Sequence, residues 1–204
     1  MTAIDTFSEI KTAVGDYLDR SDINSQIDEF IRFGELRIFR ECRLRAFETA
    51  LSSTIASGVI AVPSAYIEMK YAYVDGSPTS SLQRKDLSYI YEKYPTRSAD
   101  SKPKFYAREG SNFIFGPYPD SGYTIKGIYY GALTALSTDN ETNWIATDAP
   151  DLLVYAALLE AEPFLGNDER IPVWEAAYNR TKAHIQAQDD QEAFSGSPLA
   201  VTAA

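Results

Sequence analysis

Few side chains of this sequence are of the types that carry out catalysis by themselves. The chain has one histidine, His184, and one cysteine, Cys42. A lone thiol cannot form an internal disulfide, and a structural zinc site takes several Cys or His ligands. The sequence contains no phosphate-binding loop, nucleophile elbow or zinc-protease helix motif. We therefore predict no metal site and no cofactor, and we assign packing or surface roles to both residues.

Paired carboxylates are the remaining candidates for catalysis, because a glycosidase needs only two acidic side chains flanking a sugar-sized cleft. The chain has 29 Asp and Glu residues, so a pair by itself indicates little. The nearest pairs fall where a helix cap or a solvated helix face explains them: Glu160 with Glu162, Asp148 with Asp151, and Asp168 with Glu169. We predict that the protein is not an enzyme. The alternative is a carbohydrate-binding or polysaccharide-cleaving protein.

Tyrosines are the other abundant functional type. The chain has 14 of them, many between positions 66 and 130. Exposed tyrosines bind sugars and protein surfaces well, because the ring is apolar and the hydroxyl forms hydrogen bonds. Tyrosine is also favoured in β-strands for packing reasons alone. Both explanations stay open.

The most basic stretch lies between positions 32 and 45 of an otherwise acidic chain. It includes Arg37, Arg40 and Arg43, while the whole chain has a net charge of −10. That charge argues against a surface specialised for nucleic acid or for an anionic membrane. Asp28 with Arg32 and Glu41 with Arg45 have the spacing of ion pairs along a helix. We predict that Arg37, Arg40 and Arg43 contact another subunit or a partner protein.

Both ends of the chain have helical periodicity. Thr6 and Glu9 form a capping-box pattern for a helix from Phe7 to about residue 20, and a second helix follows a Ser21-Asp22 cap up to about residue 44. Near the other end, Asp148 is the predicted cap of a helix that Pro163 bends or ends. A last helix follows Asp168 and is predicted to fade around positions 189–190.

The middle of the chain alternates apolar and polar residues, which is typical of strands. The candidate strands are 47–54, 59–62, 66–74, 105–108, 112–115 and 123–130, with a short helix at 86–94. We predict an α+β fold in which an antiparallel bundle, residues 1–45 and 148–192, carries an inserted β-rich domain, residues 46–147. Residues 193–204 form a C-terminal extension. No uncharged apolar run is long enough to span a bilayer.

Several segments, taken in order, resemble one known family. They are 33–40 (FGELRIFR), 58–66 (GVIAVPSAY), 102–106 (KPKFY), 115–120 (FGPYPD), 128–130 (IYY), 136–144 (LSTDNETNW) and 149–161 (APDLLVYAALLEA). In this order they resemble the head-to-tail adaptor, or head-completion, proteins of tailed double-stranded DNA bacteriophages. A bacterial helical scaffold unrelated to phage is hard to distinguish from such a protein by sequence alone.

The resemblance implies a structural virion protein at the head–tail interface, assembled in the host cytoplasm. Proteins of this kind form a homo-oligomeric ring, usually of twelve subunits, that binds the portal protein and a tail nozzle or tail-tube protein. Double-stranded DNA passes through the ring without specific binding, and no membrane is involved. We expect the C-terminal extension to dock on the portal through Phe194, Pro198, Leu199 and Val201.

Overall fold

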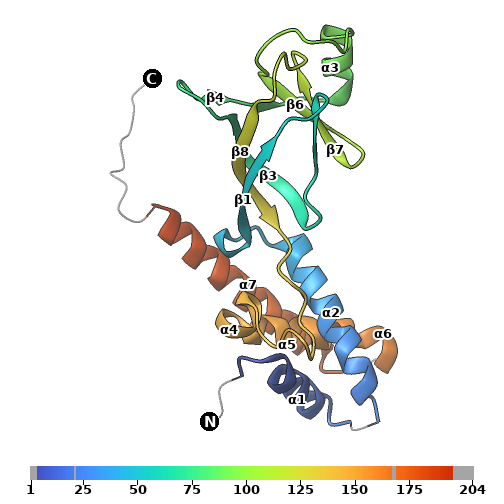
Figure 1. The fold of residues 1–204 in the computed structure, drawn as a ribbon. Coiled ribbons are helices and arrows are strands. Elements are labelled where there is room, and N and C mark those ends of the chain that lie inside the picture. Colours follow the sequence, from blue (N-terminus) through green and yellow to red (C-terminus); the bar gives the residue numbers. More distant parts are fainter. Residues whose placement is uncertain (1–3, 21, 167–168, 195–204) are drawn as a thin grey trace. The chain divides into compact units, whose positions relative to one another are not determined.

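The computed structural model describes residues 4–20, 22–166 and 169–194, and Figure 1 labels its elements. The chain divides into two compact units. One joins Met1–Ala46 with Leu133–Ala204 and contains most of the helices, and the other, Phe47–Ala132, contains the strands. The predicted α+β fold, with helices from both ends of the chain and an antiparallel sheet between them in sequence, is confirmed.

The helical unit begins with a helix that is capped as predicted. Helix α1, Phe7–Leu18, follows Thr6, whose side chain accepts a hydrogen bond from the backbone N–H of Glu9. The Glu9 carboxylate accepts in return from the backbone N–H of Thr6, at 3.2 Å. This reciprocal pair of bonds satisfies two N–H groups that have no partner within the helix.

Helix α5 is the centre of the helical unit. The other helices of the unit are α2 (Asn24–Glu41), α4 (Trp144–Asp148), α6 (Glu162–Leu165) and α7 (Ile171–Phe194), and α5 itself spans Pro150–Glu160. Helices α1, α2 and α7 all pack against α5. Its buried residues are therefore spread around the helix axis: Leu152, Leu153, Val154, Ala156, Ala157 and Leu158.

Helices α2 and α5 approach each other closely at Gly34. A β-carbon built on Gly34 would lie 2.9 Å from the backbone nitrogen of Ala157 and 3.2 Å from the β-carbon of Ala156. Small residues on both helices thus allow backbone to pack against backbone. A larger side chain at this position would push the two helices apart.

Two sheets make up most of the other unit. The first has the order β1 (Glu48–Thr54), β8 (Thr124–Gly131), β3 (Tyr66–Val74) and β4 (Ser80–Ser81). The second has the order β2 (Val59–Ala61), β7 (Asn112–Gly116), β6 (Phe105–Glu109) and β5 (Gln83–Arg84), in which only the short β5–β6 pair is parallel. The sheets share one core that contains Leu51 and Ile125 of the first and Phe113 and Phe115 of the second. Helix α3, Leu87–Lys93, packs on β6, and a 3-10 turn, Arg45–Phe47, precedes β1.

The helix ends differ from the prediction in three places. Asp148 does not cap α5; it ends the unpredicted helix α4, whose N-cap Asn143 accepts a hydrogen bond from the backbone N–H of Ala146. Helix α2 begins without a side-chain cap, and Asp22 instead binds Arg20. Helix α7 continues to Phe194 instead of fading near position 189.

Residues 133–147 lie in the helical unit, although the sequence division grouped them with the insertion. Their backbone is tied to the first helices. The backbone N–H of Phe7 donates to the carbonyl of Glu141 at 2.7 Å, and the side chain of Ser8 donates to its carboxylate at 2.9 Å. The alternation of apolar and polar residues ends before residue 133, so the sequence indicates the end of the strands. The sequence of residues 133–147 gives no indication that they contact α1.

The Gly34 contact predicts a difference between two glycines. Gly34→Ala should lower the free energy of unfolding by about 1–3 kcal/mol, because the added methyl group meets the backbone of α5. Gly15→Ala in α1 is the matched control, since its β-carbon would lie 3.4 Å from the side chain of Ile27. We expect the control to be neutral or stabilising by up to about 1 kcal/mol in urea unfolding. Equal stability of the two variants would contradict the packing described above.

We propose that the Phe47–Ala132 unit is a domain in the folding sense. Its two ends lie on neighbouring strands, because Glu48 pairs with Tyr130, and its core is contributed by both of its own sheets. The isolated fragment 47–132 should therefore give dispersed amide signals in an NMR spectrum and unfold cooperatively. A fragment with the collapsed spectrum of an unfolded chain would reject this proposal.

Candidate functional site

Arginines of the basic stretch on α2 form contacts mainly with other residues of the same chain. Arg37 donates to the carboxylate of Glu41 at 3.2 Å and to that of Glu160 on α5 at 2.8 Å. Its guanidinium also lies 5.4 Å from the ring centroid of Tyr178 on α7. One arginine thus contacts three helices.

Glu41 lies at the centre of the same network. Its carboxylate accepts hydrogen bonds from Tyr178 at 3.0 Å and from Lys182 at 2.6 Å. Burial opposes the charge of Glu41, but the bonds from Lys182 and Tyr178 outweigh it and hold the pKa of Glu41 below its ordinary value. Burial, together with the bond to this carboxylate, raises the pKa of Tyr178. The network fixes the position of α7 against the end of α2.

The other two predicted contact residues lie differently. Arg43 donates to the carbonyls of Phe39 at 2.7 Å and Cys42 at 2.9 Å, and so satisfies the last turn of α2. Arg40 is exposed, and it has no carboxylate partner in the part of the chain that the structure describes. The structure therefore does not gather Arg37, Arg40 and Arg43 into one surface. Their contact with another subunit stays a prediction.

Two ion pairs predicted along α2 are wrong. Asp28 does not bind Arg32, and Glu41 does not bind Arg45. Two of the observed ion pairs join different elements, Lys11 with Asp28 at 2.6 Å and Arg45 with Asp189 at 3.1 Å. The third lies within α2 but three residues apart, Arg32 with Glu35 at 3.2 Å. Arg45 also binds Glu192 at 2.7 Å. These bonds from Arg45 lie in the last turns of α7, where the sequence predicted the helix to fade.

Glu35 on α2 is a buried acidic residue that the sequence interpretation did not single out. Its side chain has no exposed surface, and Oε1 accepts from the backbone N–H of Leu136 at 3.2 Å and from the amide of Asn143 at 2.9 Å. Arg32 donates to the other oxygen. Glu35 thus ties the loop before α4 to the middle of α2. Its spacing from Ile27 and Ile31, both on the apolar face, was the available signal.

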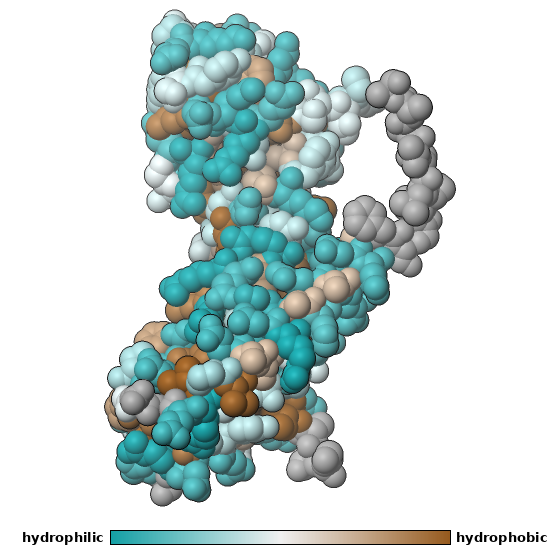
Figure 2. Space-filling model, turned by 180° about the vertical axis from the view of Figure 1, so that it is seen from behind, coloured by the Kyte–Doolittle hydropathy of each residue, from teal (hydrophilic) through white to brown (hydrophobic). Residues whose placement is uncertain are grey.

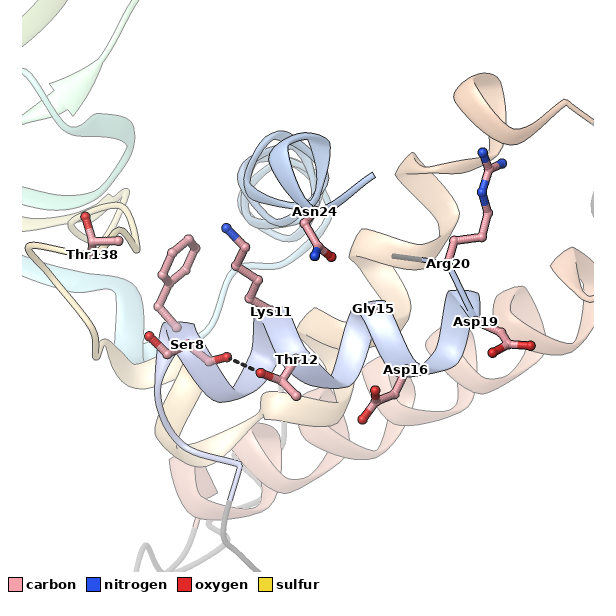
Figure 3. Close-up of a pocket in the computed structure, with 10 residues that line it drawn as sticks. Ser8, Lys11, Thr12, Gly15, Asp16, Asp19, Arg20, Asn24 and Thr138 are labelled. Carbon is pink, nitrogen blue, oxygen red and sulfur yellow. Dashed lines mark hydrogen bonds between the residues drawn. The ribbon is translucent and has the colours of Figure 1, made fainter. Parts of the chain in front are cut away.

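A cavity of about 840 Å³ lies along α1 (Figure 3). Two of its cations are neutralised, because Lys11 binds Asp28 and Arg20 binds Asp22. Asp16 and Asp19 are exposed at its edge, and among the described residues no partner binds either carboxylate. Figure 3 shows Asp16 extending from α1 on the side opposite Lys11. In the described residues, no group of three or more His, Cys, Asp or Glu could hold a metal ion.

An apolar groove of about 500 Å³ lies between α1, α5 and α7. Its lining residues are Tyr17, Tyr155, Pro172, Val173, Trp174, Ala176, Ala177 and Arg180. Val173 is 68% exposed, and Tyr17 contacts Tyr155 edge to face with ring centroids 6.3 Å apart. Arg170 lies 4.9 Å from the ring centroid of Trp174 and donates to the carbonyl of Tyr17. Figure 2 shows hydrophobic side chains reaching the surface of the helical unit.

The tyrosines of the β unit divide into core and surface residues. Tyr106 and Tyr129 are buried, and Tyr66 and Tyr106 pack against Phe113. Strand packing therefore explains these three. Tyr71 is 52% exposed and stacks on Tyr73, with ring centroids 5.6 Å apart.

The predicted portal-contact residues cannot be placed on this surface. Phe194 is the last helical residue of α7, and its side chain, with Pro198, Leu199 and Val201, lies outside the described residues. None of the helices in the described ranges is long and apolar enough to cross a membrane.

The sequence matches the family described as SU10 adaptor protein over residues 5–202. The chain belongs to this family. It is a phage adaptor, a structural component of the virion that contacts other phage head and tail proteins. A search among curated proteins gives no match.

Glu35 makes the stability of this adaptor depend on pH in a specific direction. Burial raises the pKa of Glu35 above its ordinary value of 4.5, and the bonds from Leu136, Asn143 and Arg32 offset this only in part. Between the unfolded and the folded pKa, the folded protein keeps a proton that the unfolded chain has released. The stabilisation is therefore complete below pH 4.5 and is lost as the pH rises through the folded pKa.

The corresponding test uses Glu35→Gln, with Glu29→Gln as an exposed control on the same helix. We expect the stability of the wild type relative to Glu35→Gln to decrease as the pH rises from about 4 to about 7 in urea unfolding. Glu29→Gln should follow the wild type throughout. A relative stability of Glu35→Gln that does not change with pH would contradict the buried state of this carboxylate.

Proposed function

We propose that this adaptor forms a closed ring that joins the capsid portal to the tail and lets the genome pass. Membership of the adaptor family supports a role between head and tail. The proteins that the sequence resembles usually form rings of twelve subunits. The protein acts through its surfaces, and no catalytic step is part of the proposal.

The observation that carries the ring proposal is the apolar groove on the helical unit. Tyr17 on α1 and Val173 on α7 are large apolar residues of the groove that are exposed. The described part of the chain does not cover this apolar surface. Contiguous exposed apolar surface of this kind marks protein–protein contact sites. A groove of this shape is not its own complement, so it favours a head-to-tail contact between copies, which gives a closed ring when the rotation from copy to copy adds up to a full turn.

The two remaining partners are assigned to different parts of the chain. The C-terminal extension, with Phe194, Pro198, Leu199 and Val201, docks on the portal, because an uncharged segment with few apolar anchors suits ordering upon binding. The tail nozzle or tail-tube protein meets the β unit, on which Tyr71 and Ile128 are exposed. DNA passes without specific binding, since a chain of net charge −10 provides little counterion release.

The decisive experiment measures mass by light scattering after size exclusion, for the adaptor alone and mixed with a portal ring. We expect the 22.7 kDa chain to form a stoichiometric ring on the portal. Val173→Asp should weaken ring formation about tenfold or more, because it puts a charge into the apolar groove. Asn179→Asp, an exposed position on α7 outside the groove, adds the same charge and should leave the ring intact.

Two results would reject the proposal. A wild-type chain that stays monomeric in the presence of the portal would remove the ring itself. Equal ring formation by Val173→Asp and Asn179→Asp, with both variants folded by circular dichroism, would remove the groove as the contact between copies.

A further inference from the structure

The β unit carries a group of cations without acidic partners. Between positions 84 and 108 the chain has seven Lys and Arg residues against three Asp and Glu. The cations are Arg84, Lys85, Lys93, Arg97, Lys102, Lys104 and Arg108. Among the described residues, none of them forms an ion pair with a carboxylate.

Aromatic rings hold two of these cations at the same place. The Nζ atom of Lys85 lies 5.5 Å from the ring centroid of Tyr89 and 5.7 Å from that of Phe105. The Nζ atom of Lys93 lies 5.4 Å and 5.7 Å from the same two rings, and it donates to the Tyr89 hydroxyl at 3.0 Å. We call Lys85, Lys93, Tyr89 and Phe105 the lysine–aromatic cluster. Ring faces attract a cation but leave N–H donors available for an anion.

Several cations elsewhere in the described chain are neutralised by acids. On the first sheet of the same unit, Lys126 binds Asp75 at 2.8 Å and Lys70 binds Glu48. In the helical unit, Lys11 and Arg37 bind carboxylates. Arg40 on α2 also lacks a carboxylate partner among the described residues, but the cations around α3 are seven in one short segment of a chain that has an excess of acids.

The acidic excess lies entirely in the other unit. The segments Met1–Ala46 and Leu133–Ala204 together hold ten Lys and Arg and 21 Asp and Glu, a net charge of −11. The unit Phe47–Ala132 holds nine and eight, a net charge of +1. Asp16 and Asp19, at the edge of the α1 cavity in Figure 3, are acids that no described residue pairs.

We propose that the lysine–aromatic cluster of one adaptor copy docks on the acidic helical unit of a second copy, at the edge formed by Asp16 and Asp19. The proposal rests on the ring described above and adds a polar contact to its apolar one. The two complementary surfaces belong to different units of the chain, which is compatible with the head-to-tail contact that a ring requires. Charge complementarity of this kind sets the orientation in which copies meet.

Charge also decides between a second copy and a nucleic acid as the occupant. The unit that carries the cluster has a net charge of only +1, so it provides a DNA duplex with little counterion release. The helical unit of a second copy offers carboxylates of the opposite sign at discrete positions. We therefore assign the cluster to protein, and duplex DNA becomes an outcome of the test.

The test is a charge exchange in the full-length chain, measured by sedimentation velocity at low and high salt. Lys85→Glu/Lys93→Glu and Asp16→Lys/Asp19→Lys should each weaken the self-association of the wild type at least about tenfold. An equimolar mixture of the two variants should restore association, because reversed cluster meets reversed edge and native edge meets native cluster. Lys85→Arg/Lys93→Arg keeps the charge and should associate like the wild type.

Four results would overturn the assignment. Three of them are a wild type whose association is absent or insensitive to salt, variants that associate like the wild type, and a mixture that fails to restore association although both variants are folded. A fourth is binding of a labelled DNA duplex by the wild type that Lys85→Glu/Lys93→Glu abolishes.

Portal binding is measured separately, so that this proposal and the ring can fail independently. A ring formed on the portal equally by the wild type and both variants would keep the proposed function and reject the charged contact. Restored association in the mixture, with no ring on the portal, would reject the function and keep the contact.

Discussion

The close approach of α2 and α5 at Gly34 is the contact on which the helical unit depends. Backbone packs against backbone there, which brings Glu35, the next residue, within reach of the loop before α4. Because α5 also supports α1 and α7, displacing α2 would disturb both walls of the apolar groove. One missing side chain therefore sets the geometry of a surface formed by three other helices.

The two units separate the charges of the chain. The excess of negative charge lies in the helical unit, whereas the β unit has a net charge of +1. Within the β unit, cations without a carboxylate partner among the described residues lie around α3. Among the described residues, Asp16 and Asp19 form no ion pair, and the cations around α3 form none with a carboxylate. Copies that associate head to tail would neutralise both, and the apolar groove would then be covered by the same kind of contact.

Local patterns in the sequence predicted most of the elements, and long-range contacts explain the rest. The Thr6–Glu9 capping box and the alternation of Tyr66–Val74 depend only on near neighbours, so they could be read directly. In the last turns of α7, Asp189 binds Arg45, which lies far away in sequence, so local patterns could not predict this contact. Glu35 lies on the apolar face of α2, so its position in the pattern could have predicted a buried acidic side chain. Lys85 and Lys93 both contact the rings of Tyr89 and Phe105, and this contact depends on the packing of α3 on β6, which the sequence does not show.

The dependence of the groove on the α2–α5 contact can be measured by hydrogen exchange with mass spectrometry, for the adaptor alone and bound to a portal ring. We expect the amides of α2 and α5 to exchange slowest in the free chain. We also expect portal binding to newly protect the groove helices α1 and α7. Fast exchange of α2 and α5 in the free chain, or unchanged exchange along the groove in a ring of confirmed mass, would contradict this dependence.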